Sequence, residues 1–218
     1  MDDVQLLEGD VWPFLDDLAI DLVSAYFSDA FTGNQFNRLG GGGDSGPDSN
    51  IFLPIDLIAV SMLDVHVPGS AALQILGPLG LKLTTLLTDI PNDVALEDSD
   101  PSVIVDGSPA DRLWQELTAL PQVGRTTAGK LMARKRPRLI PVFDSVIKDA
   151  LLPDASNYWI RLRNELRDPE LIKRLAEIRS NSGIGNSIPL IRVLDVCVWM
   201  RNRRESNNKL PFVPRMKG

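Results

Sequence analysis

Helix-starting and helix-stopping residues alternate through the middle of the chain, and they restrict its fold more than any other feature. Ser108 and Pro109 suit a helix start, because serine caps the first turn and proline fits the first helical position. Pro121 ends that helix, and a second helix is expected from about Arg125 until Pro137 stops it. The spacing therefore predicts two helices joined by a tight turn.

Apolar residues recur at helical spacing through most of the remaining sequence. Loops are expected at 37–50, where glycine is abundant, and at the acidic connector 91–109. Only 102–107 and 138–143 look strand-like, and no alternating strand pair carries a hairpin signal. We therefore expect an all-α fold, a multi-helix globular body. The further helices are predicted over 11–28, 56–67, 69–90, 145–152, 156–167, 168–180 and 187–205.

Charge is divided unevenly along the chain. Residues 1–111 contain 19 acidic side chains against two basic ones, whereas residues 112–218 contain 21 basic against 10 acidic. Such a division indicates a polyanionic partner for the basic half, although oppositely charged halves also neutralise each other inside one fold. We expect an acidic helical lobe at 1–107 and a basic helical lobe at 108–218, with the hairpin at about 108–136, in one compact body.

Several classes of protein are excluded by what the sequence lacks. No apolar run reaches the roughly 18 residues of a membrane span, and we expect no signal peptide, because Met-Asp-Asp-Val has no basic segment. A cytoplasmic location, with association with the nucleoid as an option, is expected. The stretch Gly40–Pro47 lacks the Gly-Lys-Ser/Thr of a phosphate loop. One histidine, His66, and one cysteine, Cys197, remove most triad and metal chemistry, and we expect both, like Trp114 and Trp159, in or near the core.

The turn between the two central helices reads Leu120-Pro121-Gln122-Val123-Gly124-Arg125-Thr126-Thr127-Ala128. It resembles the helix-hairpin-helix element, whose usual form is Leu-Pro-Gly-Val-Gly followed by a helix with an alanine near its start. Gln122 replaces the first glycine of that form, and Val123 is the apolar residue that lets the two helices pack. Unpaired N–H groups in the first turn of the second helix suit a phosphate oxygen. An ordinary helical hairpin is the alternative.

The resemblance implies DNA as the partner and a binding surface around the hairpin. Gly124, Arg125 and Thr126 would hold a phosphate, and the basic run behind them would add contacts that release counterions. We expect that run to form a basic surface beside the hairpin tip. The expected DNA-binding residues are Gln122, Val123, Gly124, Arg125, Thr126, Thr127, Lys130, Arg134, Lys135, Arg136 and Arg138.

Beyond the hairpin, residues 140–144 (Ile-Pro-Val-Phe-Asp) resemble the apolar-Pro-Val-Asp segment of the helix-hairpin-helix DNA glycosylase superfamily, with Phe143 as an extra residue. The match covers about residues 108–150. It implies that Asp144 is the catalytic carboxylate, which stabilises a cationic sugar or activates water; Asp144 also suits a plain helix cap. Thr126 stands where bifunctional members place a nucleophilic lysine, so a lyase step is not expected, and Lys130 is expected to point elsewhere.

The resemblance implies few accessory groups. Its cluster-binding branch needs four cysteines, which this chain lacks, so we expect no metal and no cofactor beyond a monovalent cation at the hairpin. Over a longer span, blocks such as residues 26–39 and 124–147 resemble an uncharacterised bacterial domain-of-unknown-function family (number 6308). That likeness supports the domain and implies no activity.

Three functions stay open at this point. The first is a DNA-binding helix-hairpin-helix protein of DNA repair, either a monofunctional glycosylase-like enzyme or an inactive relative, with Asp144 facing the sugar of a flipped nucleotide. The second is a nucleic-acid-binding module without chemistry. The third is a protein-interaction protein whose acidic half docks a basic partner. No membrane partner is expected, and the sequence does not indicate an oligomeric state.

Overall fold

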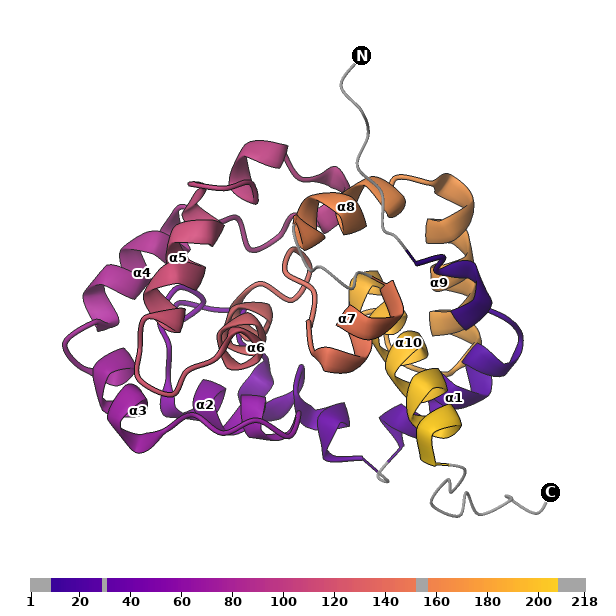
Figure 1. The fold of residues 1–218 in the computed structure, drawn as a ribbon, viewed down its shortest axis with the longest axis horizontal. Coiled ribbons are helices and arrows are strands. Elements are labelled where there is room, and N and C mark those ends of the chain that lie inside the picture. Colours follow the sequence, from indigo (N-terminus) through magenta and orange to yellow (C-terminus); the bar gives the residue numbers. More distant parts are fainter. Residues whose placement is uncertain (1–8, 29–30, 152–156, 208–218) are drawn as a thin grey trace.

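A computed structural model of the protein describes residues 9–28, 31–151 and 157–207, the side chains of 204–207 excepted. Those residues form ten α-helices and five short 3₁₀-helices without a strand, so the predicted all-α fold is confirmed (Figure 1). The α-helices are α1 Leu18–Phe27, α2 Pro54–Ser61, α3 Gly69–Leu76, α4 Gly80–Thr88, α5 Pro109–Thr118, α6 Arg125–Lys135, α7 Ser145–Leu151, α8 Tyr158–Glu165, α9 Pro169–Asn181 and α10 Leu190–Asn207. The 3₁₀-helices are η1 Trp12–Phe14, η2 Thr32–Gln35, η3 Leu39–Gly41, η4 Leu96–Asp98 and η5 Pro101–Val103.

Local capping fixes several helix starts where the sequence places them. The Ser108 hydroxyl accepts a hydrogen bond from the Asp111 N–H at 3.1 Å, and the Asp168 carboxylate accepts one from the Glu170 N–H at 2.9 Å. A cap of this kind is worth about 1 kcal/mol. The strand-like segments behave differently. Residues 101–103 form the 3₁₀-helix η5, and residues 138–143 form a turn followed by irregular chain.

The helices pack across the boundary between the acidic and basic halves of the sequence. Helix α1 packs on α9 and α10, α2 packs on α6, and α4 packs on α5. Figure 1 shows α6 near the middle, with α2 to α5 on one side and α1, α9 and α10 on the other. One hydrophobic cluster runs through both groups. Helices from both sides of residue 107 thus share one core. The expected acidic lobe at 1–107 and basic lobe at 108–218 stay a prediction.

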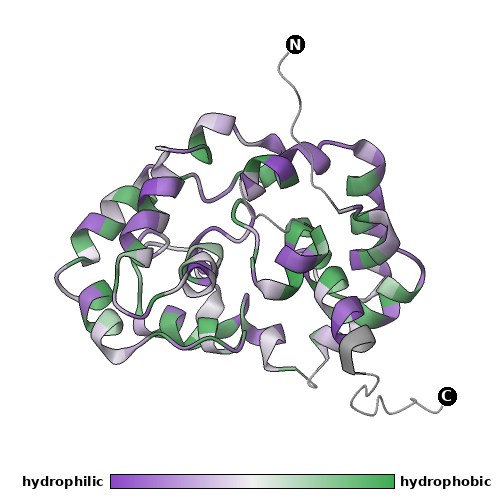
Figure 2. Cartoon of the chain, viewed as in Figure 1, coloured by the Kyte–Doolittle hydropathy of each residue, from purple (hydrophilic) through white to green (hydrophobic). Residues whose placement is uncertain are grey.

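The outer helices carry one face to the core and one to solvent. Figure 2 shows hydrophobic and hydrophilic residues mixed along them, α4 and α9 among them. Two leucines on α3 and α4 are exceptions, since Leu73 is 75% exposed and Leu81 is 79% exposed. Within the described ranges no single helix is long and apolar enough to cross a membrane; α3 and α4 meet that test only as a pair, bent by 65°.

Candidate functional site

The hairpin between α5 and α6 has the predicted position and a left-handed residue at its tip. Gln122 has φ of 64°, in the region that favours glycine, and it stands where the helix-hairpin-helix pattern has a glycine. The Val123 N–H donates to the Leu120 carbonyl at 3.1 Å, and the Val123 side chain is buried between the helices. The turn thus keeps its shape without the glycine, at the cost of backbone strain.

The start of α6 is open to solvent. Gln122, Gly124 and Arg125 are exposed, and no side chain caps the first turn of the helix. The Arg125 guanidinium lies over the Trp114 ring, 5.3 Å from its centroid. Uncapped N–H groups and the positive end of the helix dipole favour an anion at this place.

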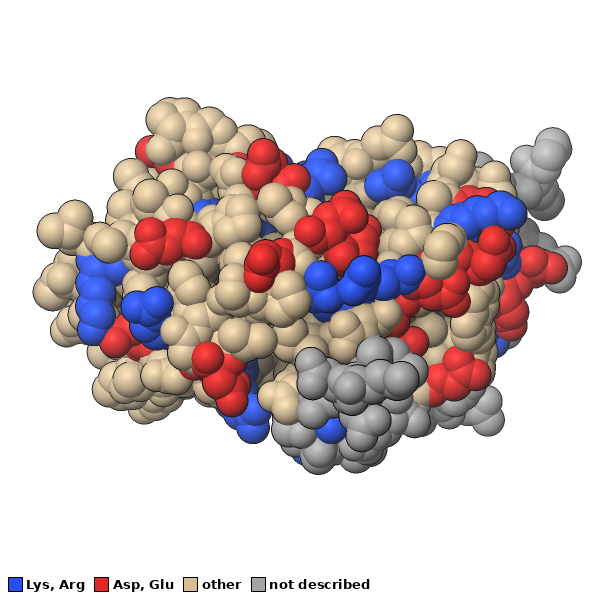
Figure 3. Space-filling model, turned by 90° about the horizontal axis from the view of Figure 1, so that it is seen from above, with Lys and Arg blue, Asp and Glu red and all other residues tan. Residues whose placement is uncertain are grey.

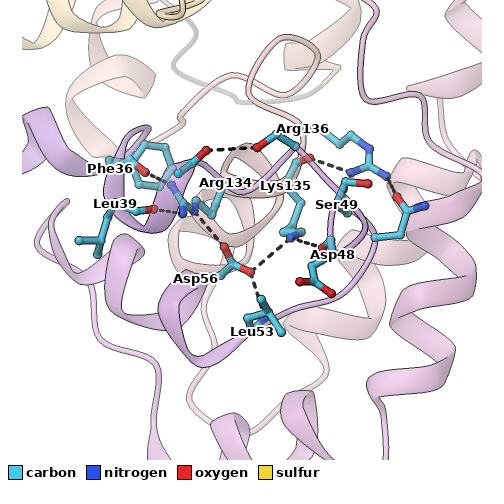
Figure 4. A network of polar contacts seen from close by, with 12 residues as sticks. Phe36, Leu39, Asp48, Ser49, Leu53, Asp56, Arg134, Lys135 and Arg136 are labelled. Atoms are coloured by element: carbon cyan, nitrogen blue, oxygen red, sulfur yellow. Dashed lines mark hydrogen bonds and ion pairs between the residues drawn. The ribbon is translucent and has the colours of Figure 1, made fainter.

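The basic run behind the hairpin is not a surface, and the prediction that it would be one is wrong. Arg134, Lys135 and Arg136 are each 1% exposed. Figure 4 shows them surrounded by the chain of residues 36–56. Arg138 alone of the run is exposed, while Thr127 and Lys130 are buried as well.

Two of the buried cations share one carboxylate. Arg134 Nε lies 3.0 Å from Asp56 Oδ1, and Lys135 Nζ lies 3.3 Å from Asp56 Oδ2 (Figure 4). Arg134 also donates to the carbonyls of Phe36 and Leu39, and Lys135 donates to that of Asp48 at 3.0 Å. The loop needs these donors, because irregular chain has few backbone partners of its own for its buried carbonyls.

Arg136 has no carboxylate partner in the described chain and donates only to uncharged oxygens. It donates to the carbonyls of Ile90 at 2.7 Å and Ser49 at 3.0 Å, to the carbonyl of Leu87, and to the Asn50 side chain. Burial lowers the pKa of its guanidinium to about 10, which leaves it charged at neutral pH. The glycine-rich stretch fits the same interface: a Cβ on Gly43 would lie 2.2 Å from the Arg134 carbonyl oxygen. The stretch is thus packed against the end of α6, whereas the sequence suggested only a loop.

Asp144 caps α7, as the sequence suggested, and borders a cavity. Its Oδ1 accepts hydrogen bonds from the N–H groups of Val146 at 3.0 Å and Ile147 at 3.1 Å. Both bonds use Oδ1, so the cap does not occupy Oδ2. The half-buried side chain lines a cavity of about 60 Å³, which is room for a few water molecules. Asp144 therefore combines the two roles that the sequence left open, a helix cap and a carboxylate at a cavity.

Lys130 lines the same cavity, and the expectation that it would point elsewhere is wrong. Its side chain is buried, and Nζ donates to the Leu63 carbonyl at 2.8 Å. No described carboxylate lies within ion-pair distance of it, in contrast to Lys135, which is bound to Asp56. Burial lowers the pKa of the Lys130 amine; Asp144 opposes this shift and Arg192 adds to it. A buried lysine without an ion-pair partner is rare in proteins.

Helix α10 supplies a third side of the cavity. Arg192 donates to the Tyr26 hydroxyl at 2.6 Å, and Asp195 Oδ2 accepts from the Val142 N–H at 3.0 Å. Burial raises the pKa of Asp195 to about 7, against the effect of Arg192. Trp199, from the same helix, lies edge-on to Tyr26 with ring centroids 5.8 Å apart. The lining of the cavity thus combines three carboxyl groups, one amine and two guanidiniums beside aromatic rings, from Asp64, Asp144, Asp195, Lys130, Arg192 and Arg203.

The family of unknown function DUF6308 matches residues 19–202 of this sequence. The chain belongs to that family. No curated protein and no solved structure matches it. These comparisons add nothing to the helix-hairpin-helix glycosylase resemblance, which rests on residues 108–150 alone.

In this DUF6308 chain, the sequence analysis missed the contribution of α10. Arg192, Asp195 and Trp199 are spaced at i, i+3 and i+7, which places them on one helix face, and that spacing was a readable signal. Cys197 is buried as expected, whereas His66 is exposed, contrary to the prediction. No group of three or more His, Cys, Asp or Glu residues in the described ranges is arranged to hold a metal ion.

The division of charge in this DUF6308 chain is partly neutralised within the fold. Besides the contacts of Asp56, Asp17 pairs with Arg174 at 3.2 Å, and Asp16 pairs with Arg201. Each pair joins the acidic half to the basic half. Figure 3 shows acidic and basic side chains interspersed on the face seen from above, with no continuous basic area there. The alternative explanation of the charge division, mutual neutralisation, therefore accounts for part of it.

Proposed function

We propose that this protein binds DNA through the tip of the hairpin and receives an extruded nucleotide in the cavity beside Asp144. The observation that carries the proposal is the course of α6. The helix begins at the exposed tip, where Gly124 and Arg125 face solvent, and about one and a half turns later it contributes Lys130 to the cavity. One rigid element thus connects an anion-binding end to a cavity that an amine and a carboxylate line.

The binding step depends on backbone N–H groups and few side chains. Because the basic run is buried, only a small number of phosphates is neutralised. We expect a shallow salt dependence, with about one power of salt concentration per phosphate contacted. Arg125 makes the nearest charged contact. Affinity then comes from shape and from the helix end more than from net charge.

The chemical step would be release of a base from its sugar. Positive charge builds on the sugar as the glycosidic bond breaks, and the Asp144 carboxylate stabilises it in a site shielded from water. As the C–N bond breaks, a water oxygen bonds to the sugar carbon, and the Lys130 amine, whose pKa burial lowers, takes the proton that the water loses and passes it to the departing base. The present cavity is smaller than a nucleotide, so the walls formed by residues 62–64 and α10 must separate when one enters.

A mobility assay tests the binding. Duplex DNA with and without an abasic site is compared at low salt for the wild type, Arg125→Glu and a matched control, Lys173→Glu. Lys173 is exposed on α9, at the other end of the molecule from the hairpin (Figure 1). We expect Arg125→Glu alone to weaken binding, with preference for the abasic duplex in the wild type. Equal loss in both variants, or no binding by the wild type, contradicts the proposal.

A second candidate function is protein binding, and one observation favours it. Leu73 and Leu81 are the most exposed large apolar side chains in the described chain, on the adjacent helices α3 and α4. Exposed apolar groups of this size are typical of contact surfaces when they lie together. Leu73→Gln with Leu81→Gln should leave DNA retention unchanged. If it instead abolishes self-association in sedimentation while the wild type shows no DNA binding, the interaction function is the better one.

A further inference from the structure

A second cavity, of about 420 Å³, lies between α5, α6 and α8. Its volume falls within the roughly 300–1,000 Å³ of sites that hold small molecules. Neighbouring residues divide between the two cavities. Lys130 and Asp144 line the first, while Gly129 and Phe143 line the second. We call the second cavity the aromatic groove, because Trp114, Phe143 and Trp159 line it.

Gly129 leaves the floor of the aromatic groove bare. It lies in the interior of α6, where glycine is less favourable than alanine. Its surroundings do not require glycine, since a Cβ there would meet nothing within 4 Å. Gly129 is nevertheless buried, so the open space beside it belongs to the groove. Helix backbone without a side chain lets a flat ligand approach closely.

The lining of the groove combines aromatic and polar groups. The rings of Trp114 and Trp159 are half-buried, and the Phe143 and Tyr158 rings, also in the lining, have centroids 4.6 Å apart. The polar part of the lining includes the Asp106 and Asp111 carboxylates and the Arg125 guanidinium. A flat aromatic ring with hydrogen-bonding edges matches this distribution.

We propose that the aromatic groove binds an unpaired nucleobase. Aromatic side chains bind bases by stacking, which every base permits. Arg125 lines the groove and also stands at the hairpin tip, so a strand whose phosphate rests on the tip has a neighbouring base within reach of the groove. The DNA source of the base rests on the proposed function. The nucleobase site itself does not, because a free nucleotide carries the same ring.

The test uses 2-aminopurine, whose fluorescence falls when its ring stacks on an aromatic side chain. Three probes are titrated with the full-length protein: a duplex with a bulged 2-aminopurine, the same duplex fully paired, and the free 2-aminopurine mononucleotide. Gly129→Leu fills the floor of the groove. Gly129→Ala is the matched control, because it adds one methyl group in open space and favours the helix.

The expected result is quenching of the bulged duplex and the mononucleotide, but not of the paired duplex. We expect Gly129→Leu to weaken the binding of the bulged duplex and of the mononucleotide by at least tenfold, and Gly129→Ala to weaken it less. The unfolding temperature of Gly129→Ala should be at or above that of the wild type. If Gly129→Leu does not fold, Trp114→Ala with a circular-dichroism check gives the same readout.

Failure of the groove and failure of the proposed function give different results. DNA retained in the mobility assay without quenching of any probe overturns the groove and leaves hairpin binding intact. Quenching of the mononucleotide without DNA binding supports the groove with a free nucleotide as its source, and removes the DNA function. Quenching that persists unchanged in Gly129→Leu also overturns the groove.

Discussion

Replacing Asp56 with asparagine leaves two buried cations without a carboxylate partner. It should be the most destabilising single polar substitution in this protein. Asp56 is 1% exposed and lies 3.0 Å from Arg134 Nε and 3.3 Å from Lys135 Nζ. Asparagine has nearly the same volume, and its oxygen can still accept the Leu53 N–H that Asp56 accepts at 3.0 Å. The substitution therefore removes the charge and one acceptor, because the amide NH2 then faces the Arg134 Nε–H that Oδ1 of Asp56 accepts.

The expected loss follows from the burial of the pair. Removing one partner of a buried ion pair costs about 3–5 kcal/mol, because the remaining charge stays without compensation. That is a large fraction of the roughly 5–15 kcal/mol that stabilises a folded protein. For a chain of this size the unfolding temperature should fall by roughly 10 °C.

Urea unfolding followed by circular dichroism measures the effect. Asp168→Asn is the matched control, because Asp168 caps α9 at the surface, where asparagine caps almost as well, and a change within about 0.5 kcal/mol is expected. Lys135→Met added to Asp56→Asn removes one stranded charge and should recover part of the loss. A loss below about 1 kcal/mol for Asp56→Asn would refute the reasoning.

Three further predictions concern the hairpin and the cavity. Gln122→Gly should stabilise the protein by about 1 kcal/mol in urea unfolding, since it relieves a left-handed backbone, and a destabilised variant would contradict the strain. Asp144→Asn should change stability by less than about 0.5 kcal/mol while lowering any base-release activity by orders of magnitude; full activity would remove Asp144 from the mechanism. Burial raises the folded pKa of Asp195 from 3.8 to about 7, so the native state binds the extra proton and its stabilising effect is lost as pH rises through that window. Asp195→Asn should therefore gain stability relative to the wild type between pH 5 and pH 8, and a pH-independent difference would show that Asp195 does not titrate there.

The hairpin was predictable because its determinants are local. The Ser108 side chain caps α5 by accepting a hydrogen bond from the N–H of Asp111, three residues later in the sequence. Pro121 ends the helix in the turn that follows it, so neighbouring residues fix the structure. The cap formed by Asp144 was predictable for the same reason, because the residue precedes an apolar helix, and its bonds to the N–H groups of Val146 and Ile147 confirm the cap. The catalytic role that the resemblance implies for Asp144 stays a prediction.

The burial of the basic run was not predictable from its own residues. Adjacent cations usually indicate a solvated surface, since lysine and arginine are rarely buried unless they are paired. Here the partners of Arg134 and Lys135 come from Phe36 to Asp56, about 80 to 100 residues earlier, and Arg136 also donates to the carbonyls of Leu87 and Ile90. Most of these partners are backbone carbonyls that no sequence pattern marks. The position of Lys130 in the same cavity as Asp144 and α10 also depends on packing between helices that are distant in sequence.

The buried end of α6 has a consequence for the order of events during synthesis. The loop around Leu39 and Ser49 owes its carbonyl partners to Arg134 and Arg136, which leave the ribosome nearly a hundred residues later. Until then the loop has only water to satisfy those groups, and the helices beside it lack the partner on which α2 packs. Contacts so distant in sequence close slowly. During synthesis the N-terminal part of this protein therefore stays incompletely folded, and accessible to chaperones and proteases, until the end of α6 is available to pack against it.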